Sequence, residues 1–133
     1  NHALGEANFL MEASVKNSNQ LYMMTALEIY DAIQDDGEKW IRDNGDFWYQ
    51  VNAEGEFFDT DYPVLTLEDL TYAMIILNDH SILGEFPVFE KMLLSKLNFV
   101  TANNYDIPKL TVERIINLGY GEYVEGYENV LEF

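Results

Sequence analysis

The sequence predicts an α+β fold in which three to four helices pack on a small antiparallel β-sheet or hairpin. Apolar residues recur at helical spacing in several separate segments, whereas residues 47–58 are rich in strand-forming aromatics on both sides of a turn. Hydrophobic residues make up 48% of the 133 positions, so the chain can bury a core despite its many charges. We therefore expect residues 1–133 to form a single acidic globular domain.

The N-terminal part begins with an ambiguous segment and continues with a clear helix. Within residues 9–16, the apolar residues Phe9, Met11, Ala13 and Val15 occupy alternate positions, which suits a strand. The sequence leaves open whether residues 1–17 form a strand, a helix or a disordered arm. After the polar break at residues 17–19, apolar residues recur at every third position and predict a helix over residues 19–34. The residues expected on its apolar face are Leu21, Met24, Leu27, Tyr30 and Ile33. Gly37 should end this helix as a left-handed cap.

A β-hairpin is predicted next. Residues 47–51 and 56–58 are the two strands, and residues 52–55 form the loop between them. Because successive side chains of a strand point to opposite faces, Trp48 points away from its two aromatic neighbours. At least one large aromatic side chain in this region is therefore exposed or covered by another element.

Three further helices are predicted in the C-terminal part. The first starts at Thr66, with Asp69 three residues later in an approximate capping box, and stops near residue 79. The second begins at Pro87, because proline favours the first helical turn, and ends within residues 101–104. The third is short and occupies residues 111–119.

Acidic residues are concentrated in one part of the chain. The net charge is −17, and residues 28–69 carry net −11 of it. In this block thirteen carboxylates are opposed only by Lys39 and Arg42, whereas residues 122–133 carry net −4. Carboxylates at this density repel one another and destabilise the compact state. Simple solubility does not require such segregation, so any functional interpretation has to explain this block.

No catalytic residue, cofactor or metal site is predicted. The chain has no cysteine and contains no nucleotide-binding, metalloprotease or serine-hydrolase motif. Asp59 and Asp61 form an Asp-x-Asp pair in a predicted loop, but such pairs arise by chance in a chain with 24 acids. His80 stands between Asp79 and Ser81, yet the members of a catalytic triad meet through the fold and not as sequence neighbours.

The acid balance also limits the partners. Nucleic acid and anionic membranes recruit Lys and Arg, of which the chain has only seven, so direct binding to either is not expected. No apolar run approaches the roughly 20 residues that span a bilayer, and no signal peptide is visible. The absence of cysteine fits a cytoplasmic protein. A basic protein remains as the expected partner, and the oligomeric state is left open.

These features favour a binding protein and not an enzyme. The expected function is to present a carboxylate-rich face to a basic protein surface, in particular the nucleic-acid groove of a nuclease or another DNA or RNA enzyme. Carboxylates on a rigid scaffold can occupy the sites of phosphates, and inhibitors of restriction and CRISPR nucleases work in this way. The residues expected to contact the partner are Asp31, Asp35, Asp36, Glu38, Asp43, Asp46, Trp48, Glu54, Glu56, Asp59 and Asp61. Trp48 would serve as an aromatic anchor among these carboxylates.

Three alternatives remain open from the sequence. An immunity protein or antitoxin against a basic nuclease toxin needs the same acidic face. An acidic structural or accessory domain, for example of phage or mobile-element origin, would use its charges only for solvation. A carboxylate enzyme or a cation-binding protein is the third class, and an enzyme would be recognised by a pocket that contains a carboxylate of raised pKa.

Overall fold

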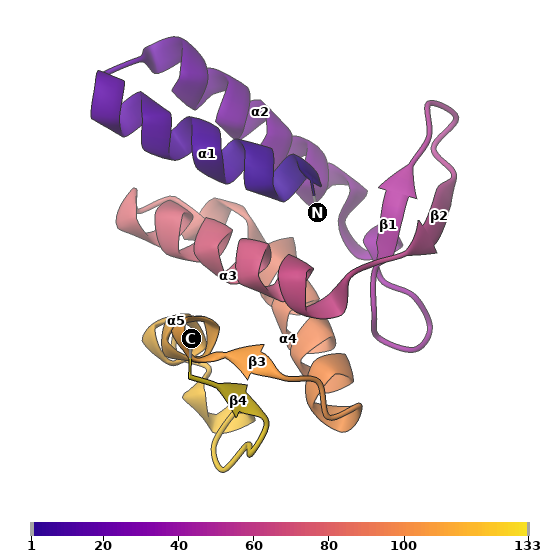
Figure 1. Cartoon of the computed structure of the whole chain (residues 1–133). Helices are drawn as coiled ribbons and strands as arrows, with labels where there is room; N and C mark the ends of the chain where they lie inside the picture. The colour runs from indigo at the N-terminus through magenta and orange to yellow at the C-terminus, as the bar shows by residue number, and fades with distance from the viewer. Residues whose placement is uncertain (1, 133) are drawn as a thin grey trace.

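Five helices and a β-hairpin dominate residues 2–132, which are the residues that this computed structural model describes (Figure 1). The helices are α1 (His2–Asn17), α2 (Gln20–Asp36), α3 (Pro63–Asp79), α4 (Pro87–Ala102) and α5 (Lys109–Asn117), with short 3-10 turns at η1 (Gly37–Trp40), η2 (Leu83–Glu85) and η3 (Gly121–Tyr123). The antiparallel hairpin consists of β1 (Trp48–Val51) and β2 (Phe57–Thr60), and the two-residue strands β3 (Ile107–Pro108) and β4 (Val130–Leu131) pair in parallel. The predicted α+β fold is confirmed, with five helices in place of three to four.

The N-terminal segment, which the sequence left open, forms helix α1. Its inward face consists of Leu4, Ala7, Met11 and Ser14, and their spacing of three and four residues is that of a helix and not of a strand. The chain turns into α2 at Ser18, which has a positive φ of 51°. The two helices lie side by side as an outer pair, and α1 also contacts α3 (Figure 1).

Helix α2 is the helix predicted in this region, and Gly37 ends it with a positive φ of 53°. The predicted apolar face is wrong, because Tyr30 and Ile33 are buried whereas Leu21 and Met24 are exposed. Each residue of an α-helix turns by about 100°, so a step of three residues falls about 60° short of a full turn. The four steps from Leu21 to Ile33 therefore drift through about 240°, which is too far for one face.

The hairpin follows the predicted strands closely. Val51 of β1 lies opposite Phe57 of β2, and β2 extends further than predicted. The side chain of Asn52 organises the loop between them, since its Oδ1 accepts the backbone N–H groups of Glu54 (3.0 Å) and Glu56 (2.9 Å). A short polar side chain that caps its own loop in this way makes the turn independent of tertiary contacts.

Helix α3 begins at Pro63, earlier than the predicted start at Thr66, because proline is also well suited to the first turn here. The predicted capping box of Thr66 and Asp69 is therefore wrong. Thr66 lies inside the helix, and its hydroxyl donates to Asp61 Oδ1 at 2.7 Å instead of capping a helix end. Helix α4 begins at Pro87 as predicted.

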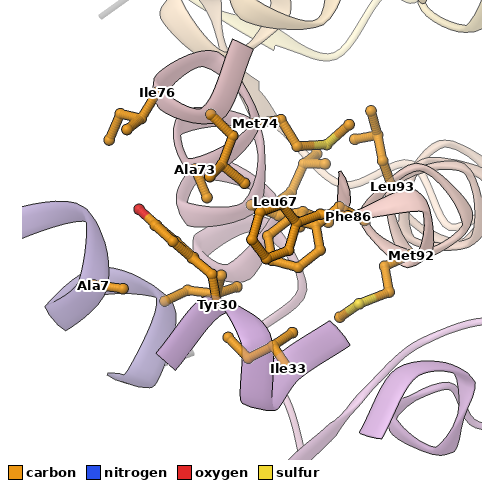
Figure 2. Packing of buried hydrophobic residues seen from close by; sticks show 14 of the residues in the cluster. Ala7, Tyr30, Ile33, Leu67, Ala73, Met74, Ile76, Phe86, Met92 and Leu93 are labelled. Carbon is orange, nitrogen blue, oxygen red and sulfur yellow. The ribbon is translucent and has the colours of Figure 1, made fainter. Parts of the chain in front are cut away.

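The core lies where α1, α2, α3 and α4 meet (Figure 2). Tyr30 projects from α2 into this cluster, and its ring packs edge-on against Phe86 at 6.2 Å and Phe89 at 6.1 Å between ring centroids. The Tyr30 hydroxyl donates to Oδ1 of Asn8 at 2.7 Å, so its polar end is satisfied inside the core. Ile115 of α5 belongs to the same cluster. Within residues 2–132, no helix combines the length and the apolar character needed to cross a membrane.

Candidate binding surface

Two of the predicted contact residues, Asp31 and Asp35, lie with Glu28 on the outward face of α2. Separations of three and four residues place these side chains in one row along the helix, with roughly 5–6 Å between neighbouring Cβ atoms. All three are exposed, and none forms an ion pair within the part of the chain that the structure describes. We call Glu28, Asp31 and Asp35 the acidic stripe.

Three more predicted contact residues, Glu54, Glu56 and Asp59, are exposed on the hairpin. The hairpin follows α2 through η1 and projects beyond the helices (Figure 1). The Asp59 carboxylate accepts a hydrogen bond from Gln50 Nε2 across the two strands at 2.8 Å, which limits its motion. We call Glu54, Glu56 and Asp59 the hairpin acids.

The segment between α2 and the hairpin places three predicted contact residues in three different environments. Asp36 is half-buried at the end of α2, and Asp43 is exposed in the following loop. Glu38 is exposed and forms an ion pair of 3.2 Å with Lys91 of α4. An exposed ion pair contributes only about 0–1 kcal/mol, so Glu38 can exchange this partner for another cation at little cost.

Asp46 and Asp61 lie in the interior and not on the predicted contact surface. Both flank the hairpin, and both carboxylates bind the ammonium group of Lys96, which is 0% exposed. The distance from Lys96 Nζ to Asp61 Oδ2 is 2.7 Å, and Thr66 donates to the other oxygen of Asp61. A buried carboxylate needs a cation and hydrogen-bond donors, and here the fold itself supplies them. We therefore exclude Asp46 and Asp61 from the candidate binding surface.

Lys96, which the sequence analysis does not single out, holds this part of the fold together. It occupies a position on the inward stripe of α4, with Met92 and Leu93 before it and Val100 after it at helical spacing. A single Lys in an otherwise apolar stripe is the signal that predicts a buried, paired ammonium group. Its Nζ also lies 4.2 Å from the centroid of the Phe47 ring, which adds a cation–π contact. Lys96 thus attaches both ends of the hairpin to α4.

Trp48 is only partly available as an anchor. Its side chain is half-buried, and the guanidinium carbon of Arg42 lies 4.9 Å from its ring centroid. The preceding Phe47 is buried in the core, which agrees with the expected alternation along the strand. A partner that reaches the Trp48 ring face covered by Arg42 has to displace this guanidinium group.

The Asp-x-Asp pair does not form a cation site. Asp61 binds Lys96 in the interior, while Asp59 is exposed and has a positive φ of 62°. Across residues 2–132, no group of three His, Asp or Glu side chains is arranged to hold a metal ion. The two carboxylates therefore serve different roles, one in the fold and one on the surface.

An open groove of about 350 Å³ lies beside the hairpin, and Tyr49, Tyr62 and Asp69 are among the residues that line it. Burial raises the pKa of Asp69 above its ordinary value. The two tyrosine rings pack edge-to-face at 5.7 Å. Asn8 donates a hydrogen bond to the backbone oxygen of Asp69. Among the described residues, no side chain donates a hydrogen bond to the Asp69 carboxylate. His2 and Glu6 also line this groove, so Asp69 is not its only titratable group.

Comparisons with protein-family models, with curated proteins and with solved structures found no match.

Proposed function

We propose that this protein is an acidic binding protein and inhibitor. Its acidic stripe and hairpin acids dock onto a basic protein surface, the nucleic-acid groove of a nuclease or of another DNA or RNA enzyme. The proposal assigns no catalytic step to the chain itself. The observation that carries it is the acidic stripe, in which Glu28, Asp31 and Asp35 stand exposed in a row on a helix and pair with no cation among residues 2–132.

The spacing of the stripe supports imitation of a phosphate backbone. The Cβ atoms that carry neighbouring carboxylates on one helix face are roughly 5–6 Å apart. Phosphates of one DNA strand rise about 3.4 Å along the axis per nucleotide, and the winding of the strand makes their direct separation larger. A helix keeps this spacing without ordering a loop, so little conformational entropy is lost when the carboxylates meet the partner.

The charge of the whole molecule supports fast association. With a net charge of −17, the protein attracts a basic partner over a distance, and this attraction raises the association rate at low salt. The hairpin acids add three exposed negative charges on an element that projects beyond the helices (Figure 1). An immunity protein would use the same surface, so the identity of the partner decides between an inhibitor and an immunity protein.

A charge-matched pair of variants tests the proposal. Glu28→Gln/Asp31→Asn/Asp35→Asn removes the acidic stripe, and Glu122→Gln/Glu125→Gln/Glu128→Gln removes three exposed charges from the tail. Immobilised protein is used to capture basic nucleases at about 50 mM salt and to release them at about 200 mM, with duplex DNA as competitor.

We expect the stripe variant to lose capture and inhibition, the tail variant to keep both, and duplex DNA to displace the captured nuclease. Equal behaviour of the two variants, or binding that duplex DNA does not affect, contradicts the proposal.

A further inference from the structure

The row of exposed side chains on α2 extends beyond the acidic stripe. Leu21 and Met24 precede Glu28 at spacings of three and four residues, so they stand on the same outward face as the carboxylates. Leu21 is 67% exposed and Met24 is 59% exposed. One helix face therefore carries two apolar side chains at its N-terminal end and three carboxylates at its C-terminal end.

The apolar end of this face is held in a defined conformation. Asn19 caps α2, and its Oδ1 accepts the backbone N–H groups of Leu21 at 3.0 Å and of Tyr22 at 3.2 Å. Thr25 Oγ1 donates to the backbone oxygen of Leu21 at 3.0 Å, which ties the first turn to the second. An anchor on an ordered helix loses less entropy on binding than one on a mobile loop.

We propose that Leu21 and Met24 form the apolar anchor of the same docking site, so that the partner's basic surface carries an apolar hollow beside its cationic groove. This inference rests on the proposed function. Asp31 lies seven positions after Met24, which corresponds to about 10 Å along the helix axis. The hollow in the partner should thus lie about 10 Å from the centre of its cationic contacts. Charges in such an interface set the association rate, and buried apolar anchors set the dissociation rate.

The charge pattern selects this occupant over two others. A second copy of the chain would bring another molecule of net charge −17 against the same face, and the two acidic stripes would repel each other. An anionic membrane surface would be repelled by the carboxylates that continue the row. A basic protein with an apolar hollow satisfies both ends of the face at once.

Two synthetic helical peptides of equal length and equal lysine content serve as probes of this chemistry. One carries lysines at one end and leucines at the other end of the same helix face, and the other carries serines in place of the leucines. Binding of each peptide to the full 133-residue chain is measured by calorimetry at about 50 and 200 mM salt. The variants are Leu21→Ser/Met24→Ser and, as the matched control, Leu110→Ser/Ile116→Ser, which removes two exposed apolar side chains from α5.

We expect the leucine peptide to bind about 10- to 100-fold more tightly than the serine peptide, as burial of one or two apolar side chains predicts. This preference should disappear in Leu21→Ser/Met24→Ser and persist in the α5 control. Equal affinities for the two peptides, or a preference that survives Leu21→Ser/Met24→Ser, overturn the inference while the proposed function stands. A dimer of the wild-type chain in sedimentation that Leu21→Ser/Met24→Ser abolishes also overturns it, because a second copy then occupies this face.

The proposed function fails in a different way. In that case the affinity of the lysine peptides does not change with salt. It also does not change in Glu28→Gln/Asp31→Asn/Asp35→Asn, the variant that lacks the acidic stripe.

Discussion

The Nζ atom of Lys96 lies 2.7 Å from Oδ2 of Asp61 in a part of the interior that solvent does not reach. The same ammonium group binds Asp46, which precedes β1, whereas Asp61 follows β2. The hairpin that carries Glu54, Glu56 and Asp59 is thereby attached at both ends to α4. One buried cation in a strongly acidic chain thus positions exposed carboxylates that it does not touch.

Replacement of this cation should be strongly destabilising. Lys96→Met leaves two buried carboxylates without a counter-charge, and loss of one partner from a buried ion pair costs about 3–5 kcal/mol. We expect a fall of this size in the free energy of unfolding, measured by urea denaturation. The triple variant Lys96→Met/Asp46→Asn/Asp61→Asn is the second test, which applies even if Lys96→Met alone does not fold, and it should recover more than half of the loss.

A surface lysine of the same helix provides the control. Lys91 pairs with Glu38 on the exposed side of α4, so Lys91→Met should change the free energy of unfolding by no more than about 1 kcal/mol. Similar losses in Lys91→Met and Lys96→Met would show that the buried cluster has no special role.

Features that depend on local geometry could be predicted from the sequence. Proline at position 87 marks a helix start because its fixed φ suits the first turn and its missing N–H is not needed there, and α4 begins at this residue. The hairpin could be placed because strand formers flank a loop that Asn52 closes on itself. In both cases the residues that determine the structure are neighbours in the sequence.

Features that depend on distant partners could not be predicted. Lys96 is 50 residues from Asp46 and 35 from Asp61, so nothing near either aspartate distinguishes it from the exposed acids of the same block. The inward stripe of α4 could have identified Lys96 as buried, but not its partners. The predicted face of α2 is wrong for a different reason, because residues at a strict three-residue spacing rotate by about 60° at each step and do not stay on one helix face.

The Tyr30 hydroxyl is a second polar group whose removal should be measurable. Burial raises the pKa of Tyr30 above its ordinary value, so the hydroxyl stays protonated and donates to Asn8 Oδ1 at 2.7 Å. Tyr30→Phe leaves this acceptor without its partner, and we expect a loss of about 1–3 kcal/mol in urea denaturation. Tyr123→Phe removes a hydroxyl from an exposed side chain and should stay within about 0.5 kcal/mol of the wild type. A loss of equal size in both variants would contradict the role of the buried hydrogen bond.

Gly37 should resist substitution for reasons of backbone conformation and not of space. Its φ of 53° and ψ of −126° lie in a region that residues with a Cβ rarely adopt, yet a Cβ there would meet only Val88, at 3.5 Å. We expect Gly37→Ala to lower the free energy of unfolding by about 1–3 kcal/mol. Gly84→Ala, where a Cβ meets nothing within 4 Å, is the control and should be neutral or slightly stabilising. If the two alanine variants unfold at the same urea concentration, the backbone conformation at position 37 imposes no penalty on a residue with a Cβ.

The raised pKa of Asp69 predicts how the free energy of unfolding changes with pH. Burial raises its pKa in the folded state, and nearby positive charges, among them Arg114, offset part of this effect. Between the ordinary pKa of a carboxyl group, about 4, and the raised value, the folded state binds more protons than the unfolded state. The free energy of unfolding therefore falls as pH rises through this window, and the loss is complete above the raised pKa.

Asp69→Asn removes the carboxyl group, so this variant should gain stability over the wild type near neutral pH and lose that advantage at about pH 4. Urea denaturation at a series of pH values measures the difference, with Asp79→Asn, an exposed carboxylate of the same helix, as the test for net charge alone. An advantage of Asp69→Asn that is constant across this range, or that Asp79→Asn reproduces, would show that repulsion among the acids and not burial of Asp69 sets the pH dependence.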